Sequence, residues 1–131
     1  MRNLLLFAVA ILGAMACDAG AMDDDGPLSY HADIAPTEAI TCNCSICRRK
    51  GSVLAAVPGD QFHLDRGEDA TTIYRFNTHK IEHHTCSTCG CSPFARGTGR
   101  DGKPMVMVNL RCAEDVDLAT LKITEFDGAS R

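Results

Sequence analysis

Three cysteines within six residues, Cys42, Cys44 and Cys47, place the strongest constraint on what this chain can fold into. Thiols at this Cys-x-Cys-x-x-Cys spacing are too close along the chain to form a normal set of disulfides. They can all point at one metal ion, and thiolate sulfur is a preferred ligand of Zn²⁺. The spacing therefore predicts a zinc site, with each sulfur about 2.3 Å from the ion.

A second Cys-x-x-Cys pair, Cys86 and Cys89, lies on a different stretch of the chain. Such a pair is the usual half-site of a tetrahedral zinc centre. A redox pair would be followed by a long helix, but Gly90, Ser92 and Pro93 come next and disfavour one. We therefore expect a second, structural zinc site, which needs two more ligands from elsewhere.

The fourth ligand of the first site decides what that site can do. Three protein ligands leave a corner for water or substrate, where a thiol could bind as thiolate or a carbonyl could be polarised. The alternative is a closed structural site completed by Cys91, Cys112 or a histidine. His83 and His84 point to opposite faces of one expected strand, and we predict neither as a ligand. A buried, inert thiol is the expected state of Cys112.

The length of 131 residues fits a single domain, and eleven glycines and five prolines divide it into short pieces. Apolar and polar residues alternate over 28–34, as in a half-buried strand. Further strands are expected at 53–57, 61–64, 71–76, 81–85, 105–110 and 122–126, with 105–110 as the central one. A short helical turn is expected within 114–121. The fold class predicted is all-β: a small β-rich zinc-binding domain with two cysteine knuckles at strand ends.

Residues 1–20 have the layout of a secretory leader. Arg2 precedes an apolar stretch over 4–12, and small residues at 14 and 16 form a cleavage pattern. The stretch is too short to span a membrane. We expect a leader over 1–20, a zinc domain over 21–131 and export to the cell envelope, with Cys17 a candidate for lipid attachment. The other interpretation is a buried strand or helix that opens the domain.

The formal net charge of −4 argues against a nucleic-acid partner. One basic run, Arg48-Arg49-Lys50, follows the first knuckle directly. It is either a solvated patch or a contact for the carboxylates of a substrate held at the neighbouring sulfurs.

Four motifs in order resemble one known family. They are CNCSICRRKG at 42–51, YRFNTH at 74–79, CSTCG at 86–90 and VNLRC at 108–112. Their order and spacing are similar to those of the glutathione-dependent formaldehyde-activating enzymes, a family that includes centromere protein V. The resemblance runs from about Gly26 to the C-terminus.

The resemblance implies a β-rich, zinc-bearing fold of the β-tent type and a cytoplasmic location, in contrast to the leader. It also implies that the zinc linked to activity is held by Cys42, Cys44 and Cys47. The reaction that names the family joins glutathione to formaldehyde and gives S-(hydroxymethyl)glutathione, which classes the enzyme as a carbon–sulfur lyase.

The second zinc site of the family departs from its pattern here. The family completes Cys86 and Cys89 with an early Cys-x-Cys-Gly, but this chain has Asp23-Asp24-Asp25-Gly26 at that place. Asp23 and Asp25 would then complete a weaker site with two sulfurs and two oxygens. In a shifted alignment, Cys17 is one ligand and the other is missing. The remaining alternative is that residues 23–25 are a solvated acidic linker and the second zinc is absent. The chain would accordingly bind two zinc ions or one.

Three functions agree with these observations. The first is a zinc-dependent carbon–sulfur lyase that acts on a thiol adduct, with glutathione as the small-thiol partner and Cys42, Cys44 and Cys47 as the catalytic metal site. The second is a non-catalytic zinc module that carries a small thiol or contacts a protein. The third is a secreted structural zinc domain without activity.

Overall fold

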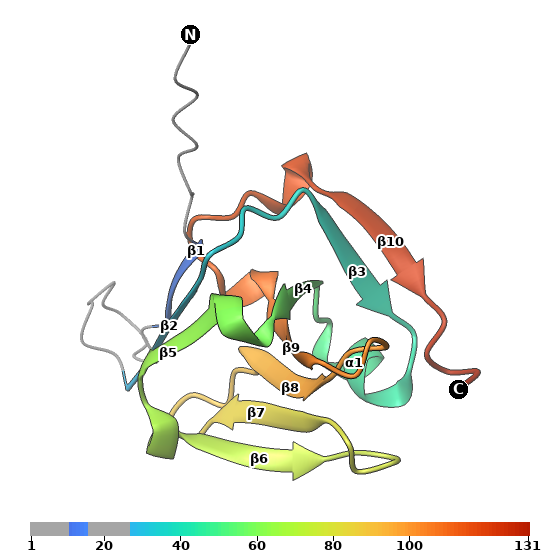
Figure 1. The fold of residues 1–131 in the computed structure, drawn as a ribbon, viewed down its shortest axis with the longest axis horizontal. Helices are drawn as coiled ribbons and strands as arrows, with labels where there is room; N and C mark the ends of the chain where they lie inside the picture. The colour runs from blue at the N-terminus through green and yellow to red at the C-terminus, as the bar shows by residue number, and fades with distance from the viewer. Residues whose placement is uncertain (1–10, 16–26) are drawn as a thin grey trace, which may run out of the picture.

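The structure is a computed structural model that describes residues 11–15 and 27–131, and Figure 1 shows its fold. The described residues form ten strands and one short α-helix. The strands are β1 (Ile11–Met15), β2 (Leu28–Ala32), β3 (Glu38–Cys42), β4 (Leu54–Pro58), β5 (Phe62–Arg66), β6 (Thr71–Arg75), β7 (Glu82–Cys86), β8 (Phe94–Thr98), β9 (Pro104–Asn109) and β10 (Lys122–Phe126). The helix is α1 (Ser45–Lys50). The prediction of an all-β domain is confirmed.

The strands form two sheets. The smaller sheet has the order β1-β2-β5, and the larger has the order β10-β3-β4-β9-β8-β7-β6. Strand β9 is the middle strand of the larger sheet, as the sequence predicts for 105–110. Strand β10 runs parallel to β3, so that Phe126 is paired with Cys42. This pairing brings the C-terminal end of the chain to the first cysteine knuckle (Figure 1).

Three elements were not expected from the sequence. Strands β3 and β8 lie in stretches that carry no strong strand pattern, and their pairing with neighbouring strands creates them. Helix α1 occupies part of the first knuckle and has six residues. It ends at Gly51, which has a left-handed conformation (φ 64°) and donates its N–H to the carbonyl of Cys47. Such a short helix is formed by its context rather than by its own propensity.

An aromatic cluster joins the two sheets. Tyr30 and Phe62 belong to the smaller sheet, and their ring centroids lie 5.6 Å apart. Phe94 of the larger sheet lies 5.6 Å from Tyr30 and 4.9 Å from Phe62. Val57 and Val108 are fully buried in the same core. Burial of these apolar side chains between the sheets is the main force that holds the sheets together.

The two faces of the larger sheet have different roles. Along β9, Val106 and Val108 are buried in the core, whereas the alternate residues Met107 and Asn109 line a cavity. This alternation follows from the two-residue period of a strand. The cavity face is the one on which the cysteine knuckle lies.

The expected leader lies mostly outside the described residues. Of residues 1–20, only 11–15 are described, and they form strand β1 paired antiparallel with β2. Cleavage, export and lipid attachment at Cys17 stay predictions. No helix in residues 11–15 and 27–131 has the length and hydropathy to cross a membrane.

Candidate metal and substrate site

The three cysteines of the first knuckle come together at the junction of a strand and a helix. Cys42 is the last residue of β3, Cys44 is the N-cap of α1, and Cys47 lies within that helix. Their sulfur atoms all lie within 4.8 Å of one another. Sulfurs bound to one tetrahedral zinc are about 3.8 Å apart, as follows from a bond of about 2.3 Å. The triad therefore fits zinc, and in the described part of the chain no fourth His, Cys, Asp or Glu joins the group.

The thiol chemistry of the triad also fits a cation. Burial, and then the neighbouring thiols of Cys44 and Cys42, raise the pKa of the Cys47 thiol to about 12. Burial acts on Cys44 in the same direction, but hydrogen bonds from Cys47 and Cys42 outweigh it and lower the Cys44 pKa. Neighbouring thiolates repel one another, so the triad does not ionise fully by itself. A bound divalent cation offsets the repulsion between the thiolates and deprotonates the thiols that coordinate it.

The C-terminal segment holds the knuckle in place through Asn43. The side-chain amide of Asn43 donates to Asp127 Oδ1 at 2.8 Å, and its Oδ1 accepts from the N–H of Ala129 at 2.9 Å. The N–H of Asn43 donates to the carbonyl of Phe126 at 3.2 Å. The carboxylate of Asp127 also accepts from Ser130 at 2.6 Å, and the bonds from Ser130 and Asn43 lower its pKa. Residues 126–130 thus form one wall of the cysteine loop.

Gly128 makes the closest approach to the triad. A Cβ atom at this position would lie 2.5 Å from Cys42 Sγ and 3.2 Å from the Cβ of Cys44. Carbon and sulfur atoms pack at much longer distances, so only glycine fits here without displacement.

The triad opens onto a cavity of about 380 Å³ on the outer face of the larger sheet. Its walls come from β3, α1, β4, β7, β8, β9, the loop between β6 and β7, and the C-terminal segment. The lining is mainly apolar, with Ile40, Leu54, Phe76, Met107 and Phe126 among its side chains. A cavity of this size, with sulfurs at one wall, matches a small-ligand site.

Polar groups converge on the same cavity. Asn109 is buried, accepts from the N–H groups of Val53 and Arg111, and donates to the carbonyl of Ser92 at 3.0 Å. His83 lies on β7, and burial, and then the positive charge of Lys50, lower the pKa of its imidazole. A lowered pKa keeps His83 neutral at pH 7. His83 is therefore able to exchange protons with a bound molecule.

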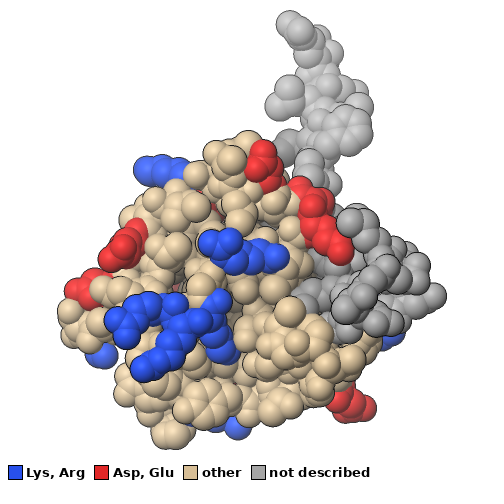
Figure 2. Space-filling view, turned by 180° about the vertical axis from the view of Figure 1, so that it is seen from behind, with Lys and Arg blue, Asp and Glu red and all other residues tan. Residues whose placement is uncertain are grey.

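The basic run beside the knuckle has divided roles. Lys50 lines the cavity, while Arg49 bonds back to the carbonyl of Ser45 within α1. Arg131, in the C-terminal segment, also lines the cavity and lies over the ring of Phe126 at 5.1 Å. Figure 2 shows that Lys and Arg side chains gather on the face opposite to the view of Figure 1. Despite the net negative charge, two cations thus border the cavity of the triad.

The second knuckle begins at the end of β7. Cys86 is its last residue and is buried, while Cys89 and Cys91 are exposed. Burial, and then the nearby thiols of Cys91 and Cys89, raise the pKa of Cys112 to about 11, so Cys112 is close to this knuckle. In the described residues Cys86 and Cys89 join no group of three metal-ligand atoms. Asp23 and Asp25 lie outside the described residues, so the second zinc site stays a prediction.

Sequence reasoning missed several residues that shape the site. The roles of Asn43, Gly128 and Arg131 depend on the parallel pairing of β10 with β3, which no local pattern signals. From the sequence, His83 is predicted not to be a metal ligand, and no other role is assigned to it. Side chains alternate along β7, so His84 packs on Phe94, with ring centroids 4.7 Å apart, while His83 lines the cavity.

Comparison with known proteins adds a family and a related structure. The family model described as "glutathione-dependent formaldehyde-activating enzyme" matches residues 25–125. A crystal structure of a protein from Rhodobacter sphaeroides is similar, with 26% sequence identity and a TM-score of 0.64. The match covers 76% of this chain and 94% of that one. The matched segment contains both cysteine knuckles and most of the cavity wall.

Proposed function

Because this chain belongs to the glutathione-dependent formaldehyde-activating enzyme family, we propose that it is a zinc-dependent carbon–sulfur lyase that acts on the adduct of a small thiol with an aldehyde. Glutathione and formaldehyde are the substrates that the family name supports. The observation that carries the proposal is the grouping of Cys42, Cys44 and Cys47 at the wall of a cavity large enough for a small ligand.

Cys42, Cys44 and Cys47 would hold the zinc ion. When bound, the ion supplies a positive charge that lowers the pKa of a substrate thiol and favours its thiolate. The apolar walls exclude water from the reacting sulfur, and electrostatic interactions are stronger there than in water.

Glutathione carries two carboxylates, and the cavity offers two cations to meet them. Lys50 and Arg131 both line it, and they come from the end of α1 and from the last residue of the chain. Contacts of carboxylates with these groups would orient the thiol toward the triad.

The proposed reaction forms one bond between the thiol sulfur and the carbonyl carbon of formaldehyde. The electron pair of the C=O bond moves to the oxygen, which takes up a proton, and the thiol proton is released. His83 in its neutral form is suited to accept the thiol proton and to return one to the hydroxymethyl oxygen. The reverse sequence cleaves the carbon–sulfur bond.

The test measures metal content, thiol binding and turnover on the same preparation. We expect zinc to bind the reduced full-length chain, glutathione to perturb the zinc–sulfur X-ray absorption signal, and formaldehyde to be converted faster than without protein. Formation of the hydroxymethyl adduct is followed by NMR of its methylene group.

Cys44→Ser should abolish all three effects, while Cys91→Ser, a change at an exposed thiol outside the triad, should leave them unchanged. Glutathione binding without accelerated turnover would refute the enzyme and support the thiol-carrying module. Unfolding of Cys44→Ser, with no glutathione response in the wild-type chain, would favour the structural zinc domain.

A further inference from the structure

Two His-x-Asp sequences meet on the outer face of the smaller sheet. His31 lies on β2 with Asp33 directly after the strand, and His63 and Asp65 lie on β5. Because side chains alternate along a strand, each histidine and the aspartate two residues later share one face. The intervening residue Ala32 is buried in the core, so the His-x-Asp face is the outer one.

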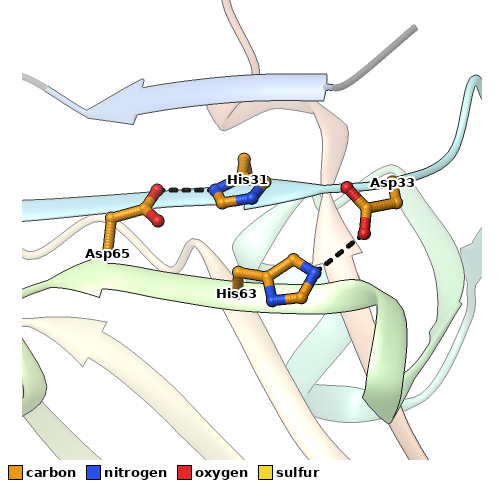
Figure 3. Close-up of polar contacts among 4 residues, drawn as sticks. All are labelled: His31, Asp33, His63 and Asp65. Atoms are coloured by element: carbon orange, nitrogen blue, oxygen red, sulfur yellow. Dashed lines mark hydrogen bonds and ion pairs between the residues drawn. The ribbon is translucent and has the colours of Figure 1, made fainter. Parts of the chain in front are cut away.

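The antiparallel register brings these residues into contact. His31 is paired directly with His63, and their rings stack with centroids 4.7 Å apart and planes 25° apart. Directly opposed residues of an antiparallel pair have Cβ atoms close enough to act together. The aspartates lie diagonally across the strand pair, each beside the histidine of the other strand (Figure 3).

Each histidine has a carboxylate partner at short distance. His63 Nε2 lies 2.8 Å from Asp33 Oδ2, and His31 Nδ1 lies 2.8 Å from Asp65 Oδ2. Figure 3 shows the other ring nitrogen of His31 on the side of Asp33. When Nδ1–H of neutral His31 donates to Asp65, Nε2 is left as a lone-pair donor facing the Asp33–His63 pair.

We propose that His31, Asp33 and His63 form a binding site for a divalent transition-metal ion such as Zn²⁺, with Asp65 as the residue that orients His31. One ligand atom from each of the three residues lies within 4.8 Å of the others. Zn–N and Zn–O bonds of about 2.0–2.2 Å place tetrahedral ligands about 3.4 Å apart. The ion would replace the proton between His63 and Asp33, and these atoms would separate by about half an ångström from their present 2.8 Å.

The chemistry of the group selects the class of ion. Two imidazoles favour zinc and related transition metals, whereas Mg²⁺ and Ca²⁺ prefer oxygen ligands. The carboxylate of Asp65 on the remote nitrogen of His31 is the arrangement that typically fixes a metal-binding histidine. The two aspartates of the group are anionic, and a divalent ion offsets the negative charge that they bring together.

The site is separate from the cysteine triad. None of the four residues lines the cavity, and their side chains are 31–49% exposed, so an ion can enter from solvent. Its ligands are nitrogen and oxygen, whereas those of the triad are sulfur. An ion here would connect β2 to β5 and strengthen the sheet that covers the core, independently of the proposed lyase activity.

The experiment uses the full-length chain, reduced with a non-chelating phosphine and titrated with Zn²⁺ alone and with Co²⁺ alone. Calorimetry with Zn²⁺ counts the ions, and thiolate-to-cobalt charge-transfer absorption reports the sulfur site separately. His63→Ala and Asp33→Asn should each bind one ion fewer than wild type, with the charge-transfer band unchanged. The control is His79→Asn, because asparagine tolerates the positive φ of 59° at this position. This variant should bind as many ions as wild type.

The variant Asp65→Asn tests whether Asp65 orients His31 rather than binding the ion itself. It should retain the ion but weaken its affinity by about 10–100-fold, as expected for a residue that acts through a ligand. Equal numbers of Zn²⁺ ions in wild type and in Asp33→Asn would overturn the proposal. The side chain of Asp33 is half exposed, so this variant keeps the fold and remains a valid test even where His63→Ala loses its circular dichroism signal.

Discussion

Substitution of Gly128 by alanine is the sharpest perturbation of the cysteine triad that the structure offers. The new Cβ would lie 2.5 Å from Cys42 Sγ, whereas non-bonded carbon and sulfur atoms pack at about 3.5–4.0 Å. One of the two must therefore move by about 1 Å, which exceeds the tolerance of about 0.2 Å in a metal–ligand distance. Asn43 anchors the C-terminal segment on both sides of Gly128, so we expect the sulfur to be displaced.

Overpacking of this kind costs about 1–3 kcal/mol. Converted at about 1.4 kcal/mol per factor of ten, this weakens metal binding at the triad by about 5- to 140-fold. The assay is a Co²⁺ titration of the reduced chain in competition with a chelator, followed by thiolate-to-cobalt charge transfer, which excludes ions bound through nitrogen and oxygen.

Gly97→Ala is the matched control, because a Cβ there meets Ile81 at an ordinary 3.5 Å. Its Co²⁺ affinity should equal that of wild type. Wild-type affinity in Gly128→Ala as well would mean that residues 126–130 move away from the sulfurs and do not form a fixed wall of the site.

Three further predictions concern the core and the cavity. Asn109→Ala leaves the N–H of Val53 without its acceptor and should lower the free energy of unfolding by about 1–3 kcal/mol in urea denaturation. Phe94→Ala should cost about 3–5 kcal/mol by the same measurement, whereas Ile123→Ala, at a side chain 45% exposed, should stay within about 0.5 kcal/mol. Because the pKa of His83 is lowered by folding, the unfolded chain binds more protons, and stability should fall as pH decreases below about 6.5. His83→Gln should reduce this pH dependence of the melting temperature; an unchanged dependence would contradict the burial of His83.

Much of the fold could be predicted from local patterns. Strand β10 has the predicted bounds 122–126, and the predicted range 105–110 overlaps the central strand β9 (Pro104–Asn109), because both carry runs of β-forming residues. Strand β3 and helix α1 were missed for a shared reason. Both elements are short and depend on other residues for their hydrogen bonds. Strand β3 pairs with β10 and β4, and α1 ends at the C-cap residue Gly51.

The candidate metal-binding residues likewise include some that the sequence groups together and some that only the structure brings together. The grouping of Cys42, Cys44 and Cys47 follows from their spacing, because residues two and three apart at a strand end and a helical turn remain within reach of one ion. The partners of the His-x-Asp sequences do not follow, although both repeats are visible in the sequence. Only the register of β2 against β5 makes His31 and His63 neighbours.

The local sequence is enough to predict a β-rich protein whose three nearby sulfurs could hold one metal ion, because strand periodicity and ligand spacing are properties of a few adjacent residues. The tertiary structure alone decided what surrounds that site: the C-terminal wall at Gly128, the cations Lys50 and Arg131, and the neutral His83. Asn43 and Ala129 are 86 residues apart, and their contact depends on the pairing of whole strands. Such pairing is a cooperative outcome of packing the core, which no short segment specifies.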